Sequence, residues 1–466
     1  MEEYDLIIIG GGAGAFASAI KANELGAKTL IVNKGLPLGG TCINVGCVPS
    51  KYLLSVGELV FKAKHHDLKS VNIPDVHFDF AKAIEEELEL VESLRKAKYE
   101  NVLSQLGKVT FIDGEARFVS SHEIEVEGKR FFAEKFVIAT GSVALPPPIE
   151  GLKETGFITH IEALRNKELP NRLVVIGAGP LGLEFAQMFN NFGSKVDVLV
   201  RGEQILSRTE PEVAYALGNY LSRDGISIWK KVAIKKVTKD GSDKVVSVEV
   251  DGKPMELRAG EILVAMGKTP NTDKLNLQVA GVEVDEKKAI KVNDSYKTTA
   301  PHIYAAGDVI DKPLRLETTA GKEGSYVAEN ALKGTTKTIN YWHVPYAVFT
   351  YPAVAGVGMT DADVIASGQK CICRTVDFAE IPKAQVIKDT RGLIKMVATE
   401  DGKIVGVHMV APYAADIINQ AVFIIKADMT IEDILESLPV FPTLSESIKI
   451  AALSFRADIT RLSCCV

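Results

Sequence analysis

Cysteine offers the most varied chemistry in this sequence, and its placement is uneven. The 466 residues contain six cysteines, which form three close pairs: Cys42 with Cys47, Cys371 with Cys373, and Cys464 with Cys465. So few cysteines in so long a chain favour redox or metal chemistry over a disulfide scaffold. Thiolates bind soft metal ions and exchange with disulfides. The three pairs are therefore the first candidates for reactive groups.

The first pair lies in the segment GGTCINVGCVPSK. In a regular helix, an offset of five residues separates two side chains by about 140° around the axis and about 7.5 Å along it, too far for a disulfide. The segment must therefore bend if the sulfurs meet, and Asn44 and Gly46 permit a bend. Pro49 suits the start of the next helix, whose positive end would lower the pKa of Cys47. The alternative is two buried cysteines in an apolar helix.

The other two pairs have different settings. Cys464 and Cys465 lie among the last residues, where structural sulfur is poorly protected. Unless this tail is incidental, we expect it to handle something that thiolates bind. Cys371 and Cys373, in KCICRT, would share one face of a strand and so could hold a soft metal. Packing of small apolar side chains is the interpretation that we prefer for them.

Two glycine-rich turns identify the elements that position these groups. Residues 4–35 and 172–202 each predict a buried strand, a glycine turn, a helix and a second strand. The pattern G-x-G-x-x-[GA] falls on Gly10, Gly12 and Ala15 in the first segment and on Gly177, Gly179 and Gly182 in the second. Missing side chains let the backbone approach a pyrophosphate at the helix N-terminus. Two such folds predict two bound dinucleotides.

Short apolar strands mark where the chain crosses between domains. They are FVIATGS, ILVAMGKTPNT and HIYAAGDVI, and after about residue 335 the pattern changes to alternating strands and then helices. We expect an α/β fold with two Rossmann-like domains and a C-terminal α+β domain. The predicted boundaries are 1–145 and 263–335 for a discontinuous first domain, 146–262 for the second, inserted domain, and 336–466 for the third.

The net charge and the hydropathy of the chain limit the kinds of partner that this protein is expected to bind. The chain has 54 basic and 60 acidic side chains, a net charge of −6, without long blocks of one sign. This pattern does not indicate a surface for nucleic acid or acidic membranes. No apolar stretch approaches the roughly 20 residues that span a bilayer, and the first residues are acidic rather than a basic signal region. We expect a cytoplasmic protein whose partners are small molecules or a second copy.

Taken together, GGTCINVGCVPSK, both glycine motifs, YAAGD and FPTLSE resemble the FAD-dependent pyridine nucleotide-disulfide oxidoreductases from Tyr4 onward. The resemblance implies a homodimer with most of its interface in the third domain. It also implies that NAD(P)H reduces FAD and that FAD reduces a Cys42–Cys47 disulfide. In this scheme Cys47 faces the flavin and Cys42 exchanges with substrate.

The same resemblance implies further cofactor contacts. Lys51 matches a lysine near the reactive flavin nitrogen, paired with a glutamate that matches Glu184, and Asp308 matches the carboxylate that binds the FAD ribityl chain. Asn33 stands where the family has an acid for the adenosine ribose, but an amide still accepts a hydrogen bond. The other positions implied to contact FAD are Gly10, Gly12, Ala13, Ala15, Gly35, Gly40, Thr41, Ala116, Thr140, Gly141, Gly307 and Leu316.

The second nucleotide fold favours NADPH over NADH. Its second strand ends at Val200 and Arg201, without an acid at the ribose position. An acid there would repel a 2′-phosphate, whereas Arg201 and Arg208 could bind one. The alternative is that both arginines are merely solvated.

The segment FPTLSES bears on the substrate. Relatives that reduce organic disulfides carry His-Pro-Thr, and their histidine moves protons to and from sulfur. Here Phe441 stands at that position and cannot move a proton. Reduction of Hg(II) to Hg(0) needs two electrons and no proton on the product, and mercury prefers thiolate ligands. Cys464 and Cys465 would then deliver Hg(II) to the Cys42 and Cys47 pair.

The chain thus resembles the Hg(II)-reducing members of the family. Tyr99, in RKAKYENVL, matches an active-site tyrosine of those members, although a packing role is its ordinary interpretation. They have a second tyrosine where Phe441 stands, and many carry an N-terminal metal-binding domain, which we do not expect here. The alternatives are a thioredoxin-reductase-like or dihydrolipoamide dehydrogenase-like disulfide reductase, or a flavoprotein subunit of a larger complex.

Overall fold

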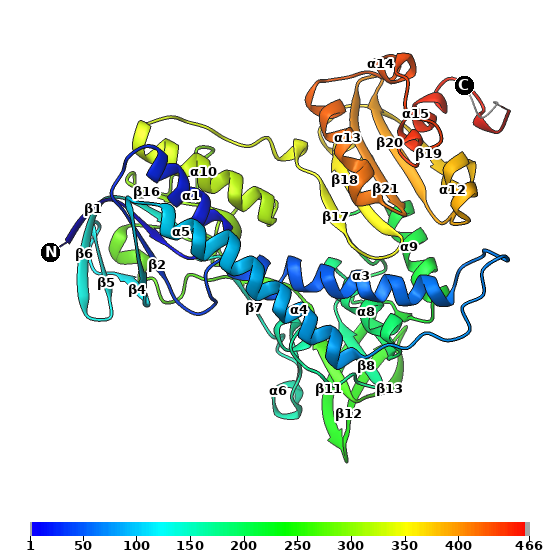
Figure 1. Ribbon diagram of the computed structural model, residues 1–466, viewed down its shortest axis with the longest axis horizontal. Helices are drawn as coiled ribbons and strands as arrows, with labels where there is room; N and C mark the ends of the chain where they lie inside the picture. The colour runs from blue at the N-terminus through cyan, green and yellow to red at the C-terminus, as the bar shows by residue number, and fades with distance from the viewer. Residues whose placement is uncertain (1, 462–466) are drawn as a thin grey trace. The chain divides into compact units, whose positions relative to one another are not determined.

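The computed structural model describes residues 2–461 and divides the chain into two compact units (Figure 1). Unit 1 consists of Met1–Tyr52, Ile84–Pro146 and Gly267–Tyr341, and unit 2 consists of Leu53–Ala83, Pro147–Met266 and Trp342–Val466. The first nucleotide fold is therefore discontinuous, which confirms the predicted α/β fold with a second nucleotide fold inserted into the first. In the described part of the chain, every helix is too short or too polar to span a bilayer.

Unit 1 is built on a seven-stranded sheet with a parallel centre. Its strands are β1 (Glu2–Ile9), β2 (Thr29–Asn33), β3 (Val109–Asp113), β4 (Ala116–Phe118), β5 (Glu123–Val126), β6 (Lys129–Ile138) and β16 (Ile303–Ala305). They lie in the order β3-β2-β1-β6-β5-β4, with β16 also paired to β6. β4 and β5 are antiparallel additions, and the other strands run parallel. A separate two-stranded sheet pairs β7 (Ser142–Ala144) with β15 (Lys268–Pro270).

The helices of unit 1 connect these strands. They are α1 (Ala13–Glu24), α2 (Gly40–Val45), the first part of α3 (Cys47–Lys64), most of α4 (Phe80–Arg95), the π-helix η1 (Lys96–Glu100), α5 (Asn101–Gln105), the 3-10 helices η2 (Leu277–Ala280) and η3 (Gly307–Val309), and α10 (Glu317–Lys333). The helices α1 and α10 pack together. A Cβ at Gly324 would lie 2.1 Å from the carbonyl oxygen of Gly14, so only glycine permits this close approach.

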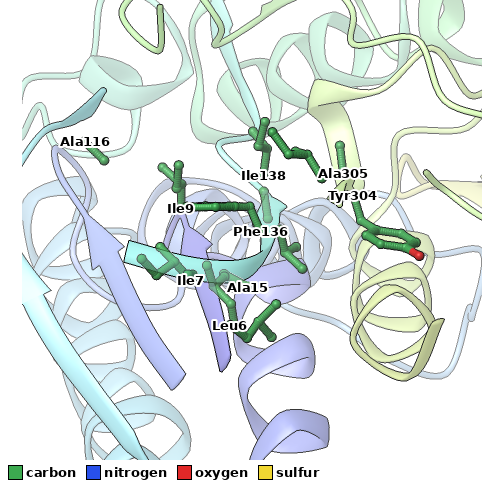
Figure 2. Packing of buried hydrophobic residues seen from close by; sticks show 14 of the residues in the cluster. Leu6, Ile7, Ile9, Ala15, Ala116, Phe136, Ile138, Tyr304 and Ala305 are labelled. Carbon is green, nitrogen blue, oxygen red and sulfur yellow. The ribbon is translucent and has the colours of Figure 1, made fainter. Parts of the chain in front are cut away.

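The core of unit 1 explains why β1 is apolar on both faces. Parallel strands at the centre of a sheet are covered on both sides and so bury nearly every side chain. Figure 2 shows Leu6 and Ile7 of β1 and Ala15 of α1 as members of one cluster of buried hydrophobic residues. All three are fully buried. The small side chain of Ala15 therefore lets α1 lie close against the sheet.

The second nucleotide fold lies in unit 2. Its parallel strands have the order β10-β9-β8-β14, and an antiparallel sheet β11-β12-β13 follows β10 in the chain. The elements are α6 (Leu152–Thr155), α7 (His160–Ala163), β8 (Arg172–Ile176), α8 (Pro180–Phe192), β9 (Lys195–Leu199), α9 (Pro211–Arg223), β10 (Ser227–Trp229), β11 (Val232–Asp240), β12 (Asp243–Val250), β13 (Lys253–Ala259) and β14 (Glu261–Val264). At the glycine turn, a Cβ on Gly182 would lie 2.0 Å from the carbonyl oxygen of Gly177, so the motif closes a tight turn into α8.

The C-terminal part of unit 2 is the expected α+β fold. Its antiparallel sheet has the order β17-β18-β21-β20-β19. The elements are η4 (Tyr341–His343), β17 (Tyr346–Val348), β18 (Ala353–Gly358), α11 (Asp361–Ala366), β19 (Cys371–Asp377), η5 (Phe378–Glu380), α12 (Pro382–Ile387), β20 (Leu393–Thr399), β21 (Ile404–Ala411), α13 (Ala414–Lys426), α14 (Ile431–Glu436), α15 (Glu446–Leu453) and η6 (Ile459–Arg461).

A buried lysine joins the two parts of unit 2. The ammonium group of Lys395 on β20 is 2.9 Å from Glu210, 3.0 Å from Glu212 and 2.7 Å from Asp361. Only 2% of this side chain is exposed, so its charge needs these partners. The cluster ties the start of α9 to β20 and α11.

Candidate active site

A helix break brings the first cysteine pair together. α2 ends before Gly46, which leaves the helical region with φ −132° and ψ −111°, and α3 begins at Cys47. A Cβ at Gly46 would lie 2.8 Å from the carbonyl oxygen of Thr41 and 3.2 Å from the Cα atom of Cys42. No side chain fits between the two helices at this point, and the structure has the bend that the spacing predicted.

Asn44 holds the turn that leads into α2. Its amide N–H groups donate to the carbonyl oxygens of Pro37, at 3.1 Å, and Gly40, at 2.8 Å. Its amide oxygen accepts a hydrogen bond from the Arg95 guanidinium at 3.3 Å. Asn44 is buried, so these bonds satisfy a polar group that would otherwise destabilise the turn. Both residues named for the bend therefore position Cys42.

The pKa values of the two thiols are shifted in opposite directions. Cys42 is half-buried, Cys47 is exposed, and both are free. The interaction between the two neighbouring sulfur groups raises the pKa of Cys42 and lowers the pKa of Cys47. The ammonium group of Lys51 lowers the pKa of Cys47 further, and the N-terminus of α3 also favours an anion there. Cys47 is therefore the more acidic thiol of the pair, and Cys42 holds its proton more tightly.

Both cysteines line a cavity of about 540 Å³ in unit 1. Most of the predicted FAD contacts line the same cavity, and they are Gly10, Gly12, Ala13, Asn33, Gly35, Gly40, Thr41, Ala116, Thr140, Gly141, Gly307, Asp308 and Leu316. Ala15 and Lys51 are not among the lining residues. Ala15 is buried beneath the glycine turn. The positive charge of Lys51 lowers the pKa of Cys47, which does line the cavity.

The lining of this cavity fits a dinucleotide. A Cβ at Gly10 would lie 2.2 Å from the carbonyl oxygen of Ala139, so the turn is limited to glycine and presents backbone to the cavity. Gly12 precedes α1 without a side-chain cap, which leaves the first N–H groups of the helix for an anion. Asp308 accepts a hydrogen bond from the Ser142 hydroxyl at 2.6 Å and offers a carboxylate for a polyol. The residues present therefore suit FAD.

Glu317 is a functional candidate that the sequence analysis did not identify. It is the first residue of α10, it lines the same cavity as Cys42, and its carboxyl group lies close enough to the Cys42 thiol for each to shift the pKa of the other. Burial raises the pKa of this carboxyl group, and its charge raises the pKa of both Cys42 and Cys47. Glu317 belongs to no motif, and 275 positions separate it from Cys42, so only the fold reveals this contact.

Tyr99 lies on the π-helix η1, close to the cysteine pair but not on the cavity lining. Its ring contacts the ring of Phe16 edge to face, with centroids 4.8 Å apart. A Cβ at Gly39, just before α2, would lie 3.0 Å from the Tyr99 ring. Burial and the charges of Glu317, Cys42 and Cys47 raise the pKa of the phenol. Tyr99 therefore packs beside the pair as a neutral hydroxyl group.

Other predicted site residues lie in unit 2 or outside the described residues. Glu184 is buried on α8 and accepts a hydrogen bond from the backbone N–H of Phe349 at 2.9 Å. Its pairing with Lys51, a residue of unit 1, stays a prediction. Arg201 and Arg208 are exposed near the second glycine motif, and Phe441 is 49% exposed. The tail pair, Cys464 and Cys465, lies outside the described residues.

The fold and site define a class of flavoprotein. Residues 4–324 match the family model described as pyridine nucleotide-disulphide oxidoreductase, and residues 344–452 match the dimerisation domain of the same family. The chain belongs to this family of FAD-dependent oxidoreductases. The second match supports a homodimer.

Individual relatives are similar over the full chain. Mercuric reductase from Bacillus cereus is 38% identical over 464 residues, which cover 99% of this chain and 73% of that protein. Mercuric reductase from Streptomyces lividans is 35% identical and matches 99% of this chain and 98% of its own length. Among solved structures, the HOCl-induced flavoprotein disulfide reductase RclA from Escherichia coli superposes with a TM-score of 0.86 at 29% identity, covering 97% of this chain and 99% of that one.

Proposed function

We propose that this protein reduces Hg(II) to Hg(0) with electrons from NADPH. The observation that carries the proposal is the combination of a reactive pair, Cys42 and Cys47, with Phe441 at the position where disulfide-reducing relatives carry a histidine. Full-length similarity to mercuric reductases supports it. Mercury needs thiolate ligands and electrons, and it needs no proton on the product.

The chain's own residues prepare the thiols for the metal. FAD and NAD(P)H are the cofactors typical of the family, and when bound they supply two electrons from a nicotinamide. Lys51 favours the thiolate of Cys47, so one ligand is ready before Hg(II) arrives. Cys42 must lose its proton to become the second ligand, and the Glu317 carboxylate is in position to accept it. Two electrons then convert Hg(II) to Hg(0), which leaves both thiolates behind.

The remaining site assignments form part of this proposal. Arg201 and Arg208 bind the 2′-phosphate of NADPH, and neither forms an ion pair with the described part of the chain. Tyr99 contacts the metal site through its hydroxyl group. Cys464 and Cys465 carry Hg(II) to the inner pair of the other subunit. The domain boundaries given above and the cytoplasmic location also stay predictions.

Reduction of a small organic disulfide is the second candidate function. It is favoured by Glu317, because a carboxyl group beside Cys42 can hold the proton that relatives keep on histidine. Cys42 thiolate would attack the disulfide, and the departing thiolate would take the proton from Glu317.

One substrate comparison separates the two candidates. NADPH oxidation is followed with Hg(II) in excess small thiol, and in parallel with thioredoxin, glutathione disulfide and lipoamide. We expect turnover with Hg(II) and little with the disulfides, and Phe441→His should raise disulfide reduction if it changes it at all. Rapid reduction of a disulfide by the wild type would favour the second candidate.

Transfer from the tail is tested with a mixed dimer. One subunit lacks Cys42 and Cys47, and the other lacks Cys464 and Cys465. If the tail serves the other subunit, one of the two sites is complete, and about half of the wild-type activity returns. The assay uses Hg(II) held by a bulky dithiol. Activity no higher than that of the two parent homodimers would exclude transfer between subunits.

A further inference from the structure

The third cysteine pair lies on the edge strand of the C-terminal sheet. Cys371 and Cys373 alternate with Ile372 on β19, and their sulfur atoms are 3.6 Å apart. Both side chains remain partly exposed, whereas Ile372, on the other face, packs against the hydrophobic core. The packing of small apolar side chains, which the sequence analysis preferred for these cysteines, thus leaves part of each thiol accessible. They present two thiols on one face of an accessible edge.

The sulfur separation suits a bridging metal better than a disulfide. A disulfide needs sulfur atoms about 2 Å apart, and two alternate residues of a strand have Cα atoms about 6.6 Å apart, near the upper limit for a bridge. With metal–sulfur bonds of about 2.3 Å, two ligands lie about 3.8 Å apart at a tetrahedral angle and about 4.6 Å apart in a linear arrangement. Small rotations of the two side chains would change the sulfur–sulfur distance from 3.6 Å to either value.

The charges around this pair are mixed. Burial and the hydrogen bond to Cys371 raise the pKa of Cys373 to about 12, while Lys395 lowers it and Asp361 raises it. A hard cation gains little from two neutral thiols. A soft cation can displace both protons and form two covalent metal–sulfur bonds.

We propose that Cys371 and Cys373 form a second, two-coordinate site for a thiophilic metal cation. The identification of that cation as Hg(II) rests on the proposed function. Binding exchanges two S–H bonds for two S–Hg bonds and releases two protons, without any change of oxidation state. Since the described residues contain no cluster of three or more His, Cys, Asp or Glu side chains that could hold a metal, they supply no further ligand set here. A thiol from another molecule can therefore bind the two-coordinate metal ion as a third ligand. The site thus suits transfer of the ion rather than its storage.

The chain just after α15 contacts the strand that carries the cysteine pair. The Arg374 side chain donates to the carbonyl oxygen of Ser454 at 3.1 Å and lies over the ring of Phe455, 5.3 Å from its centroid. The end of α15 is thus fixed beside β19.

The test uses a variant in which only this pair remains. Cys42, Cys47, Cys464 and Cys465 are changed to Ser, and Hg(II) is titrated anaerobically into the FAD-loaded protein in the presence of millimolar cysteine. We expect one Hg(II) per chain, retained through desalting, with ultraviolet absorption from mercury–thiolate bonds. Changing either Cys371 or Cys373 to Ser should weaken binding about 100-fold, because chelation is lost.

A matched control keeps two thiols on the same face but separates them. In Cys373→Ser/Thr375→Cys, added to the same background, the sulfur-bearing residues are about 13 Å apart along the strand. Thr375 is exposed, so the exchange should be tolerated. Equal affinity in this control, or two independently held ions in the test variant, would contradict the proposal.

A second measurement tests the proposal even if the variant with four or more cysteines replaced does not fold. Cys371→Ser/Cys373→Ser in the otherwise native protein should bind one Hg(II) fewer per chain than the wild type, and an unchanged stoichiometry would overturn the proposal. Neither measurement depends on turnover. A protein that lacks Hg(II) reductase activity but binds the ion at this pair would refute only the proposed function.

Discussion

The carboxyl group of Glu317 lies close to the thiol of Cys42 on the lining of one cavity, although α2 and α10 lie far apart in the sequence. The contact gives the reactive pair a titratable neighbour within unit 1. The carboxylate charge raises the pKa of Cys42 and of Cys47. The Glu317 charge therefore moves the pH range in which the thiolate forms upward.

Replacing Glu317 with Gln should move thiolate formation to lower pH. The substitution removes a negative charge that raises the Cys47 pKa, so that pKa falls and the thiolate persists further into the acid range. A titration of the long-wavelength absorption between thiolate and flavin measures the change. Glu329→Gln, a half-buried position on α10 paired with Lys337, is the control and should leave the titration unchanged. An upward shift in the Glu317 variant would contradict this role.

The two inner cysteines should differ when each is changed to Ala. Cys47 is the more acidic thiol, so Cys42→Ala should retain the thiolate-to-flavin absorption in the reduced enzyme, and Cys47→Ala should lack it. Anaerobic spectra after addition of one equivalent of NADPH provide the measurement. The opposite pattern would exchange the roles of the two sulfurs.

Gly46→Ala should separate the pair. The added Cβ would meet the carbonyl oxygen of Thr41 and the Cα atom of Cys42, and such overpacking costs about 1–3 kcal/mol. We expect slower disulfide formation, measured by thiol titration during mild oxidation, and a lower free energy of unfolding. Gly107→Ala is the control, because a Cβ at Gly107 meets no atom within 4 Å. Similar behaviour of the two variants would argue against a special role for Gly46.

Arg201→Ala should reduce the preference for NADPH. A charge-assisted hydrogen bond contributes about 1.5–3 kcal/mol, so the ratio of kcat/KM for NADPH to that for NADH should fall about 10- to 100-fold. Steady-state kinetics with both nucleotides check this, with the exposed Arg165→Ala as control. Equal use of the two nucleotides by the wild type would mean that Arg201 is only solvated.

Local patterns allowed much of the fold to be predicted, because glycine turns and apolar strands are encoded by neighbouring residues. The bend at Gly46 followed from the spacing of two cysteines and the geometry of a helix. Glu317 could not be found in this way, since its role depends on a contact between distant elements. The partial exposure of Cys371 could not be predicted either, because alternation along a strand does not reveal that the strand lies at an edge.

The most direct measurement of the proposed activity is the capture of elemental mercury. Purified, FAD-loaded protein is incubated with NADPH and Hg(II) in excess thiol, and the vapour carried off by inert gas is quantified together with NADPH consumption. We predict one Hg(0) for each NADPH consumed, and no Hg(0) above background from Cys42→Ala or Cys47→Ala. NADPH consumption by the wild type without release of Hg(0) would contradict mercury reduction by this protein.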